Sequence, residues 1–278
     1  MAWDHYYSDG RAAYDSIAPH YDASVGRFSV SWRAKRLALD MIAGLTPPKG
    51  SLLDIGSYTG NEALDLARRG YSVLGIDISP EMVRIAREKA KKFRLDGRAR
   101  FEVMRASELN ALVEQGSEVF DTAYSVYGTL NLEPQLERVK RALVTLLREE
   151  GAFVCGLLNP SVLYELVVAP IALKFHGYRK LAKHGVRTRI GLGQHVVEAY
   201  LYSPKEFAEE MRPEFVATKK LGVHILYPPP RGKGVMGGKK GMDLWWAARA
   251  LDAVELRIQE RHPFSSLGFF SLLELRKA

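Results

Sequence analysis

The stretch LLDIGSYTGNEALDLARRGYSVLGID, residues 52–77, decides the fold. A short apolar run ends at Gly56, a helical pattern begins after Gly60, and a second apolar run ends at Asp77. Glycines between a strand and a helix let the backbone turn sharply and present N–H groups to an anionic ligand group. Asp77 lies 21 residues after Gly56, where an acid can accept hydrogen bonds from ribose hydroxyls. The pattern predicts a cofactor site of the nucleotide type.

The same alternation of strand and helix patterns continues along the chain. Strands that alternate with helices form a mostly parallel sheet, and ligands bind at the carboxyl ends of its strands. We therefore predict an α/β fold with a doubly wound, Rossmann-like, seven-stranded sheet, mostly parallel with an antiparallel last strand. The expected strands are 51–55, 72–76, 99–104, 119–126, 152–158, 215–226 and 269–276, and the expected helices are 61–69, 80–92, 134–148 and 243–260.

A single domain is expected to span residues 1–278. It divides into four parts, because the βαβ pattern covers only the middle of the chain. These parts are an N-terminal helical cap (1–50), a cofactor-binding core (51–158), a helical substrate cover inserted after the fifth strand (159–214), and the last two strands with a helix between them (215–278).

Composition limits the class of protein. The net charge is +8 and the single cysteine, Cys155, excludes an internal disulfide framework and a cysteine-rich metal site. No His, Asp or Glu spacing fits zinc or magnesium, so no metal is predicted. The apolar stretch 160–175 contains Glu165 and Lys174 and is shorter than the ~20 residues of a membrane span. With no signal-peptide pattern at its start, the chain is expected to be cytoplasmic, and its few Asn and Gln are typical of a thermophile.

Residues 52–77 resemble the first two motifs of class I S-adenosylmethionine-dependent methyltransferases, whose usual form is D/E-x-G-x-G-x-G. Asp54, Gly56 and Gly60 match this form, and Tyr58 replaces the middle glycine. The segment YDSIAPHYD, residues 14–22, resembles the entry segment of the ubiquinone and menaquinone methyltransferase branch, which closes over the cofactor. The resemblance implies S-adenosylmethionine as cofactor, with contacts at Tyr14, Tyr21, Asp54, Gly56, Ser57, Tyr58, Gly60, Asn61, Asp77, Ile78, Met82, Ala106, Ser107, Glu108, Ser125 and Val126.

The reaction implied by the resemblance is in-line methyl transfer to a small molecule. Proximity and orientation could supply ~7–11 kcal/mol of the barrier, and a base is needed only where the acceptor stays protonated. The candidates for this base are Tyr127, which follows the fourth strand, and His20, with His195 and His224 behind them.

The acceptor is expected to be lipophilic or anionic. The run PSVLYELVVAPIALKF, residues 160–175, is expected either to pack in the hydrophobic core or to have a binding role. In the second case it would form an apolar substrate pocket or a face that contacts a membrane surface. The neighbouring basic segments 179–189 and 231–241 would then face an anionic substrate or lipid headgroups.

Three other functions compete with this one. The basic cover fits a transfer RNA methyltransferase, although no RNA-binding module and no Asn-Pro-Pro-Tyr-type motif is present. A non-catalytic partner subunit would explain the loss of the middle glycine at Tyr58. A nicotinamide oxidoreductase is disfavoured, because G-S-Y-T-G-N lacks two glycines of G-x-G-x-x-G.

Overall fold

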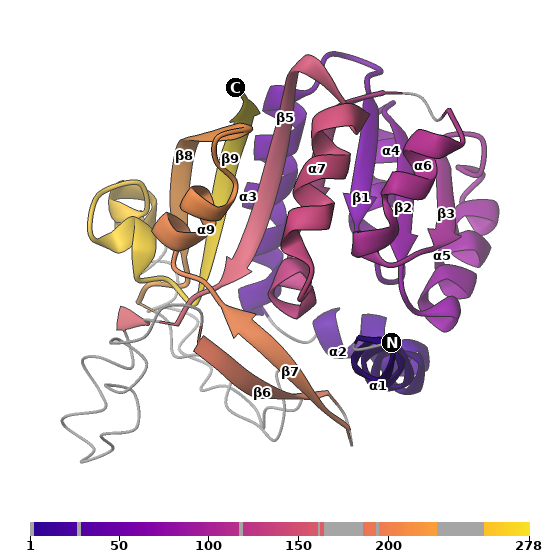
Figure 1. The fold of residues 1–278 in the computed structure, drawn as a ribbon, viewed down its shortest axis with the longest axis horizontal. Coiled ribbons are helices and arrows are strands. Elements are labelled where there is room, and N and C mark those ends of the chain that lie inside the picture. The colour runs from indigo at the N-terminus through magenta and orange to yellow at the C-terminus, as the bar shows by residue number, and fades with distance from the viewer. Residues whose placement is uncertain are drawn as a thin grey trace.

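The computed structural model describes residues 3–26, 29–116, 119–160, 162–163, 186–192, 195–226 and 253–278. Its centre is a seven-stranded sheet with the order β3-β2-β1-β4-β5-β9-β8 (Figure 1). Strands β1 to β5 pair in parallel, and β9 pairs antiparallel with both β5 and β8. The predicted fold class is therefore confirmed. The strands are β1 Ser51–Ile55, β2 Ser72–Asp77, β3 Ala99–Val103, β4 Phe120–Ser125, β5 Leu147–Leu158, β8 Phe215–Val223 and β9 Phe270–Lys277.

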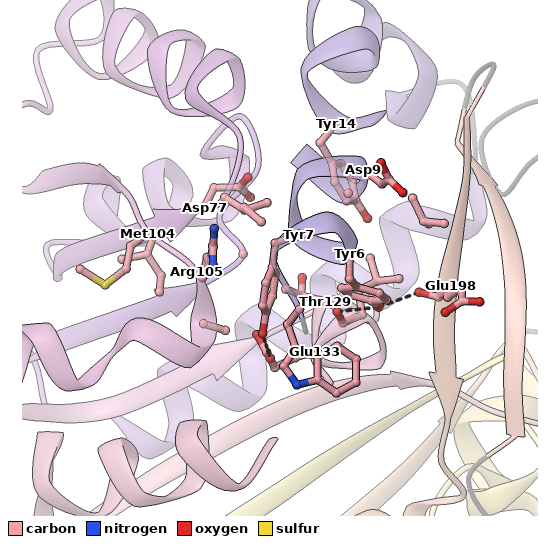
Figure 2. Close-up of a pocket in the computed structure, with 18 of the residues that line it drawn as sticks. Tyr6, Tyr7, Asp9, Tyr14, Asp77, Met104, Arg105, Thr129, Glu133 and Glu198 are labelled. Atoms are coloured by element: carbon pink, nitrogen blue, oxygen red, sulfur yellow. Dashed lines mark hydrogen bonds between the residues drawn. The ribbon is translucent and has the colours of Figure 1, made fainter. Parts of the chain in front are cut away.

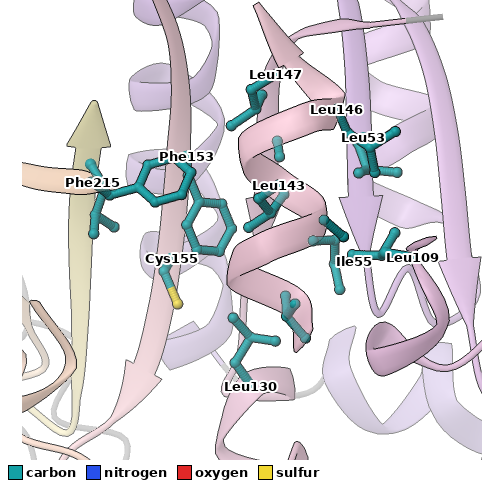
Figure 3. Close-up of a cluster of buried hydrophobic side chains, with 14 of the residues drawn as sticks. Leu53, Ile55, Leu109, Leu130, Leu143, Leu146, Leu147, Phe153, Cys155 and Phe215 are labelled. Atoms are coloured by element: carbon teal, nitrogen blue, oxygen red, sulfur yellow. The ribbon is translucent and has the colours of Figure 1, made fainter. Parts of the chain in front are cut away.

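Helices cover both faces of the sheet, which buries two separate apolar clusters. One cluster joins the sheet to α3 (Ser29–Leu45), α4 (Asn61–Arg68) and α5 (Pro80–Lys92). The other joins it to α6 (Asn110–Glu114), α7 (Leu136–Leu146) and α9 (Pro204–Glu210). Figure 3 shows this second cluster between α7 and the strands, with Cys155 buried in it.

The helix boundaries follow local sequence signals. The expected N-cap of α5 is confirmed, because the Ser79 side chain accepts from the Met82 N–H at 3.1 Å and Pro80 takes the first helical position. Helix α7 is shorter than the expected 134–148, since β5 already begins at Leu147. Of the expected helix 243–260, residues 253–258 are described and are helical.

Two further pieces lie at the edge where the parallel strands end (Figure 1). The first consists of α1 (Asp4–Ile17), the short 3-10 helix η1 (Ala18–His20) and α2 (Tyr21–Gly26). The second is a two-stranded antiparallel sheet of β6 (Val186–Leu192) and β7 (His195–Leu201). A doubly wound sheet binds its ligands at this edge, so the two pieces lie where a ligand would bind.

The expected helical cover at 159–214 is wrong for residues 186–192 and 195–201, which form β6 and β7. Buried residues alternate along β7 at Val197, Ala199 and Leu201, and this period of two is the strand signal that was missed. The apolar run 160–175 lies outside the described residues except for positions 160, 162 and 163, and the basic segment 231–241 lies outside them entirely. Of the basic segment 179–189, only residues 186–189 are described, and they belong to β6. Among the described residues, no helix is long and apolar enough to cross a membrane.

Candidate functional site

The glycine turn after β1 has the predicted sharp geometry. Gly56 and Gly60 have φ values of +81° and +77°, and the N–H groups of Gly56 and Ser57 both donate to the Ile76 carbonyl at 2.8 and 2.9 Å. A Cβ on Gly56 would lie 2.3 Å from the Thr129 side chain. Tyr58 has a φ of +48°, so this position keeps the left-handed backbone of the glycine that it replaces.

Asp77 closes the other side of this turn at the end of β2. Its Oδ2 accepts from the Tyr58 N–H and its Oδ1 from the Ser79 N–H, both at 2.9 Å. The side chain is 5% exposed, and burial raises the pKa of Asp77 to about 6 although both backbone donors favour the charged form. A buried, fixed carboxylate is therefore presented next to the glycine turn.

A cavity of about 310 Å³ lies against this carboxylate. It is bounded on one side by the sheet edge, on another by α1 and on the third by β7, as Figure 2 shows for Asp77, Tyr6 and Glu198. Its volume is at the lower end of the range for small-molecule sites. Six of the sequence-predicted contacts line it: Tyr14, Gly56, Tyr58, Asp77, Ile78 and Ala106.

An aromatic cluster joins the glycine turn to the N-terminal helices. The rings of Tyr21 and Tyr58 stack at 5.0 Å with an interplanar angle of 11°, and Tyr14 meets Tyr58 edge-on at 5.6 Å. Met82 and Val197 complete the cluster. Tyr21 thus packs against the Tyr58 ring without lining the cavity itself, and Met82 is buried behind the cavity wall.

Two carboxylates of the N-terminal helices hold these helices to the cofactor side of the sheet. Asp22 of α2 accepts from Thr59 Oγ1 at 2.5 Å, from Asn61 Nδ2 at 2.9 Å and from Lys89 Nζ at 2.9 Å. The Asn61 side chain is therefore engaged with α2, outside the cavity lining. Asp15 of α1 accepts from the Ser79 hydroxyl at 2.5 Å, at the start of α5.

Other predicted contacts lie next to the cavity or deeper in the fold. Burial raises the pKa of Asp54 well above its usual range, which favours a neutral carboxyl inside the sheet. Glu108 is exposed and lines a neighbouring hollow of about 260 Å³. The remaining residues are buried and outside the cavity lining: Ser57, Ser107, Ser125 and Val126, with Gly60 at the N-cap of α4.

The expected base candidates do not meet in the cavity. The Tyr127 hydroxyl donates to Glu62 Oε1 at 3.3 Å, and neither residue is part of the cavity lining. His20 is exposed at the end of η1 and His195 is exposed at the start of β7, while His224 is buried after β8. Neither Tyr127 nor His20 is part of the lining of this cavity, and their assignment as catalytic residues stays a prediction.

Several cavity residues were missed by the sequence reading. The Tyr7 hydroxyl donates to Glu133 Oε1, and the Tyr6 hydroxyl lies 2.9 Å from the Leu132 carbonyl and 2.8 Å from the Glu198 carbonyl (Figure 2). The adjacent aromatic residues at positions 6 and 7, ahead of the family-like segment, were a signal that could have found α1. Nothing local in the sequence marks Glu133.

The described residues fit S-adenosylmethionine on three independent features. The turn at Gly56 leaves no room for a side chain, Asp77 presents a buried acceptor, and Ile78, Met104 and Ala106 add apolar lining beside it. These features suit an amino acid group, a ribose and a flat base in that order. Among the described residues, no cluster of His, Cys, Asp or Glu could hold a metal ion.

Comparison with known proteins agrees with this fit. Residues 52–151 match the family model described as "Methyltransferase domain". A ubiquinone/menaquinone biosynthesis C-methyltransferase of Geobacter sp. (strain M21) is 36% identical over 135 residues, which cover 47% of this chain and 54% of the relative. A demethylmenaquinone methyltransferase of Porphyromonas gingivalis is 29% identical over 220 residues, covering 76% and 82%. The chain thus spans about half the length of the first of these relatives and most of the second.

Solved structures show the same fold. The [4+2]-cyclase SpnF superposes with a TM-score of 0.64 at 21% identity, covering 96% of this chain and 95% of that one. The 1,6-didemethyltoxoflavin-N1-methyltransferase of Burkholderia thailandensis, solved with S-adenosylhomocysteine, superposes with a TM-score of 0.56 at 18% identity, covering 99% and 89%. The family match, with the strand order and the turn at Gly56, shows that residues 52–151 are a methyltransferase domain, whose cofactor is S-adenosylmethionine. The solved structures add that its fold is that of class I methyltransferases.

Proposed function

We propose that the protein transfers a methyl group from S-adenosylmethionine to a small lipophilic acceptor. The observation that carries this proposal is the composition of the cavity. On the side of the sheet it is lined by Asp77 and by the glycine turn at Gly56, which suit the cofactor. Its opposite walls are largely aromatic and aliphatic, and two of their side chains, Trp3 and Val196, are 37% and 63% exposed. An apolar acceptor would bury this exposed surface, which is favourable by ~25 cal/mol per Å².

The names of the relatives support a lipid-like acceptor. Two are the quinone methyltransferases described above, and a third, from Cereibacter sphaeroides, is a phosphatidylethanolamine N-methyltransferase that is 32% identical over 134 residues. Quinones with prenyl tails and phosphatidylethanolamine are both membrane lipids. We therefore place a prenylated quinol first among acceptors and a phospholipid amine second.

The chain's residues have binding and orienting roles in this proposal. Asp77 accepts from the ribose hydroxyls, the turn at Gly56 holds the amino acid group, and Ile78 with Ala106 flanks the base. When bound, S-adenosylmethionine would supply an electrophilic methyl group and its sulfur would keep the electron pair of the broken S–C bond. The electron pair of the new bond would come from the ring π electrons of a quinol, whose ring carbon would then lose a proton to solvent, or from the lone pair of an amine. Helix α1 and β7 orient the acceptor and exclude water, and such positioning accounts for ~7–11 kcal/mol in comparable reactions.

The test measures radiolabelled methyl transfer from S-adenosylmethionine to three acceptors. These are a short-chain demethylmenaquinol, phosphatidylethanolamine vesicles and total transfer RNA, each with and without the protein. We expect label in the organic extract of the quinol reaction. Label in transfer RNA alone would replace our proposal with the RNA methyltransferase, and tight binding of S-adenosylhomocysteine without transfer to any acceptor would support a non-catalytic partner subunit.

A further inference from the structure

The cavity lies across the point where the strand order of the sheet reverses, between β1 and β4. In the proposed function the ribose of the cofactor contacts Asp77 at the end of β2, and its amino acid group contacts the turn at Gly56 after β1. Strand β4 lies on the other side of β1 from β2. The lining residues that follow β4, which include Thr129 and Leu132, are therefore left for the methyl acceptor.

Tyr58 connects these two halves of the cavity. Its N–H donates to Asp77 Oδ2 at 2.9 Å, on the cofactor side. Its hydroxyl lies 3.3 Å from Thr129 Oγ1, on the side of β4, and its ring belongs to the same cluster as Val197 of β7. The side chain thus extends from the glycine turn toward the acceptor half of the lining.

The Tyr58 ring is held in one orientation and has one side left for a ligand. Tyr21 stacks on one face of the ring, at 5.0 Å with an interplanar angle of 11°, and is not part of the cavity lining. The part of Tyr58 that lines the cavity is therefore its other face or its edge. Tyr14 meets the ring edge-on at 5.6 Å. A ring fixed in this way can pack against another flat ring, either offset-stacked or edge to face.

The backbone of Tyr58 is a separate sign that its side chain has a role. The φ of +48° is a conformation that glycine adopts without strain and tyrosine does not. Strained residues of this kind cluster at binding sites, where the surrounding structure holds them. A glycine could donate the same N–H to Asp77, so what tyrosine adds at this position is its ring and its hydroxyl.

We infer that Tyr58 packs against an aromatic ring of the methyl acceptor and positions that ring next to the cofactor. The inference rests on the proposed function and narrows it, because it makes the acceptor a flat aromatic molecule and rules out the phospholipid amine. Leu132 and Val197, which also line the acceptor half, are apolar but favour no particular shape. The shape preference therefore comes from Tyr58, which acts as a positioning residue and takes no part in forming or breaking bonds.

The experiment measures acceptor binding to protein saturated with S-adenosylhomocysteine, by isothermal titration calorimetry. The probes are short-chain demethylmenaquinone, the air-stable form of the quinol, and dihexanoyl phosphatidylethanolamine, which has no ring. We expect the wild type to bind the quinone more tightly than the phospholipid. Tyr58→Leu should weaken quinone binding by about 3- to 10-fold, the range of an aromatic pair, and change S-adenosylhomocysteine binding by less than about twofold. Tyr58→Phe keeps the ring and should restore the quinone affinity.

The matched control is Tyr202→Leu, which removes a tyrosine ring that packs on Phe207 outside the cavity lining and should bind both ligands as the wild type does. Unchanged quinone affinity in Tyr58→Leu, or an equal loss of affinity for S-adenosylhomocysteine, would overturn the inference. Tighter binding of the phospholipid than of the quinone would overturn it as well, and would leave the proposed function with its second acceptor. Binding of S-adenosylhomocysteine with neither acceptor would refute the lipophilic acceptor itself, and the inference with it.

Should Tyr58→Leu fail to fold, nuclear Overhauser effects in the wild type decide. Protein with ¹³C-labelled tyrosine rings is loaded with S-adenosylhomocysteine and the quinone. We expect an effect between the quinone ring protons and one tyrosine ring, and the loss of that signal in Tyr58→Phe assigns it to Tyr58. Effects to other tyrosines without one to Tyr58 would overturn the inference.

Discussion

At the scale of single residues, Asp77 and Tyr58 show how the turn builds a binding site around a non-glycine residue. The Tyr58 N–H donates to Asp77 although its backbone has a conformation that side chains disfavour. The stacked rings of Tyr21 and Tyr58 compensate for this strain. The turn therefore keeps its geometry, and its side chain becomes part of the cavity wall.

Replacing Asp77 by Ala should weaken S-adenosylhomocysteine binding by about 1–3 kcal/mol, because the hydrogen bonds from the ribose hydroxyls are lost. Isothermal titration calorimetry measures this loss. Asp96→Ala, in an exposed turn ahead of β3, is the control and should bind as the wild type does. Equal affinity in both variants would show that another acid holds the ribose.

The same residue predicts a pH dependence. The pKa of Asp77 is raised to about 6 by burial, and the ribose hydroxyls donate to its ionised form. Affinity for S-adenosylhomocysteine should thus be full above this pKa and fall as the pH decreases through about 6. Titrations at several pH values, repeated with Asp77→Asn, check the assignment, since the amide variant should lose this step.

Tyr58→Gly tests whether the packing of the Tyr58 ring or the strain of its backbone contributes more to the free energy of unfolding. Glycine relieves about 1–2 kcal/mol of left-handed strain, whereas removal of a buried aromatic ring costs about 3–5 kcal/mol. We expect a net loss of about 1–4 kcal/mol in the free energy of urea unfolding, with S-adenosylhomocysteine still bound. A more stable variant would mean that the stacking on Tyr21 contributes little, and complete loss of binding would make Tyr58 a cofactor contact.

At the scale of elements, α1 and α2 are fixed to the cofactor side by carboxylates. Asp22 contacts the glycine turn and Lys89 of α5, while Asp15 contacts the start of α5. These helices cover the cavity through contacts that are mostly side chain to side chain. Such contacts are easier to break than a strand pairing, so we expect the N-terminal helices to be the part of the wall that opens for ligands.

Asp22→Ala should loosen this part of the wall. It removes the acceptor for Thr59, Asn61 and Lys89, so we expect faster amide hydrogen exchange in residues 4–26 and faster dissociation of S-adenosylhomocysteine. Mass spectrometry and stopped-flow fluorescence measure the two rates. Asp40→Ala, exposed on α3, should change neither. Unchanged exchange in the Asp22 variant would mean that the tyrosine cluster alone holds α1 and α2.

The parts of the fold and of the site that could be predicted are those marked by local sequence patterns as long as a few helices or strands. Residues 52–77 hold strand, turn, helix and strand within one local pattern, so the turn, Asp77 and the sheet class followed from it. Strand β7 was not predicted, because residues 160–214 fit no βαβ unit and were expected to be helices that cover the sheet. Glu133 and Tyr7 lie 126 positions apart, and their contact arises only when the sheet brings α1 over the short 3-10 helix η3 (Thr129–Leu132). His20 had a suitable side chain, but its exposure depends on how η1 packs.

At the scale of the whole molecule, ligand binding should raise the free energy of unfolding. S-adenosylhomocysteine at 100 times its dissociation constant adds ~2.7 kcal/mol, and a chain of this size gains about 2–4 °C per kcal/mol. A thermal-shift titration should therefore move the melting temperature by several degrees, while NAD at the same concentration should leave it unchanged. A shift with NAD alone would favour the oxidoreductase alternative.

The placement of the two chain ends has a practical consequence. Trp3 is part of the cavity wall, whereas β9 runs to the opposite edge of the sheet and ends there (Figure 1). A purification tag or fluorophore joined ahead of Trp3 would sit at the mouth of the cavity, and immobilising the chain there on a sensor chip would slow ligand entry. Fusion partners and surface tethers therefore belong after Ala278, where they leave the cavity mouth open to ligands.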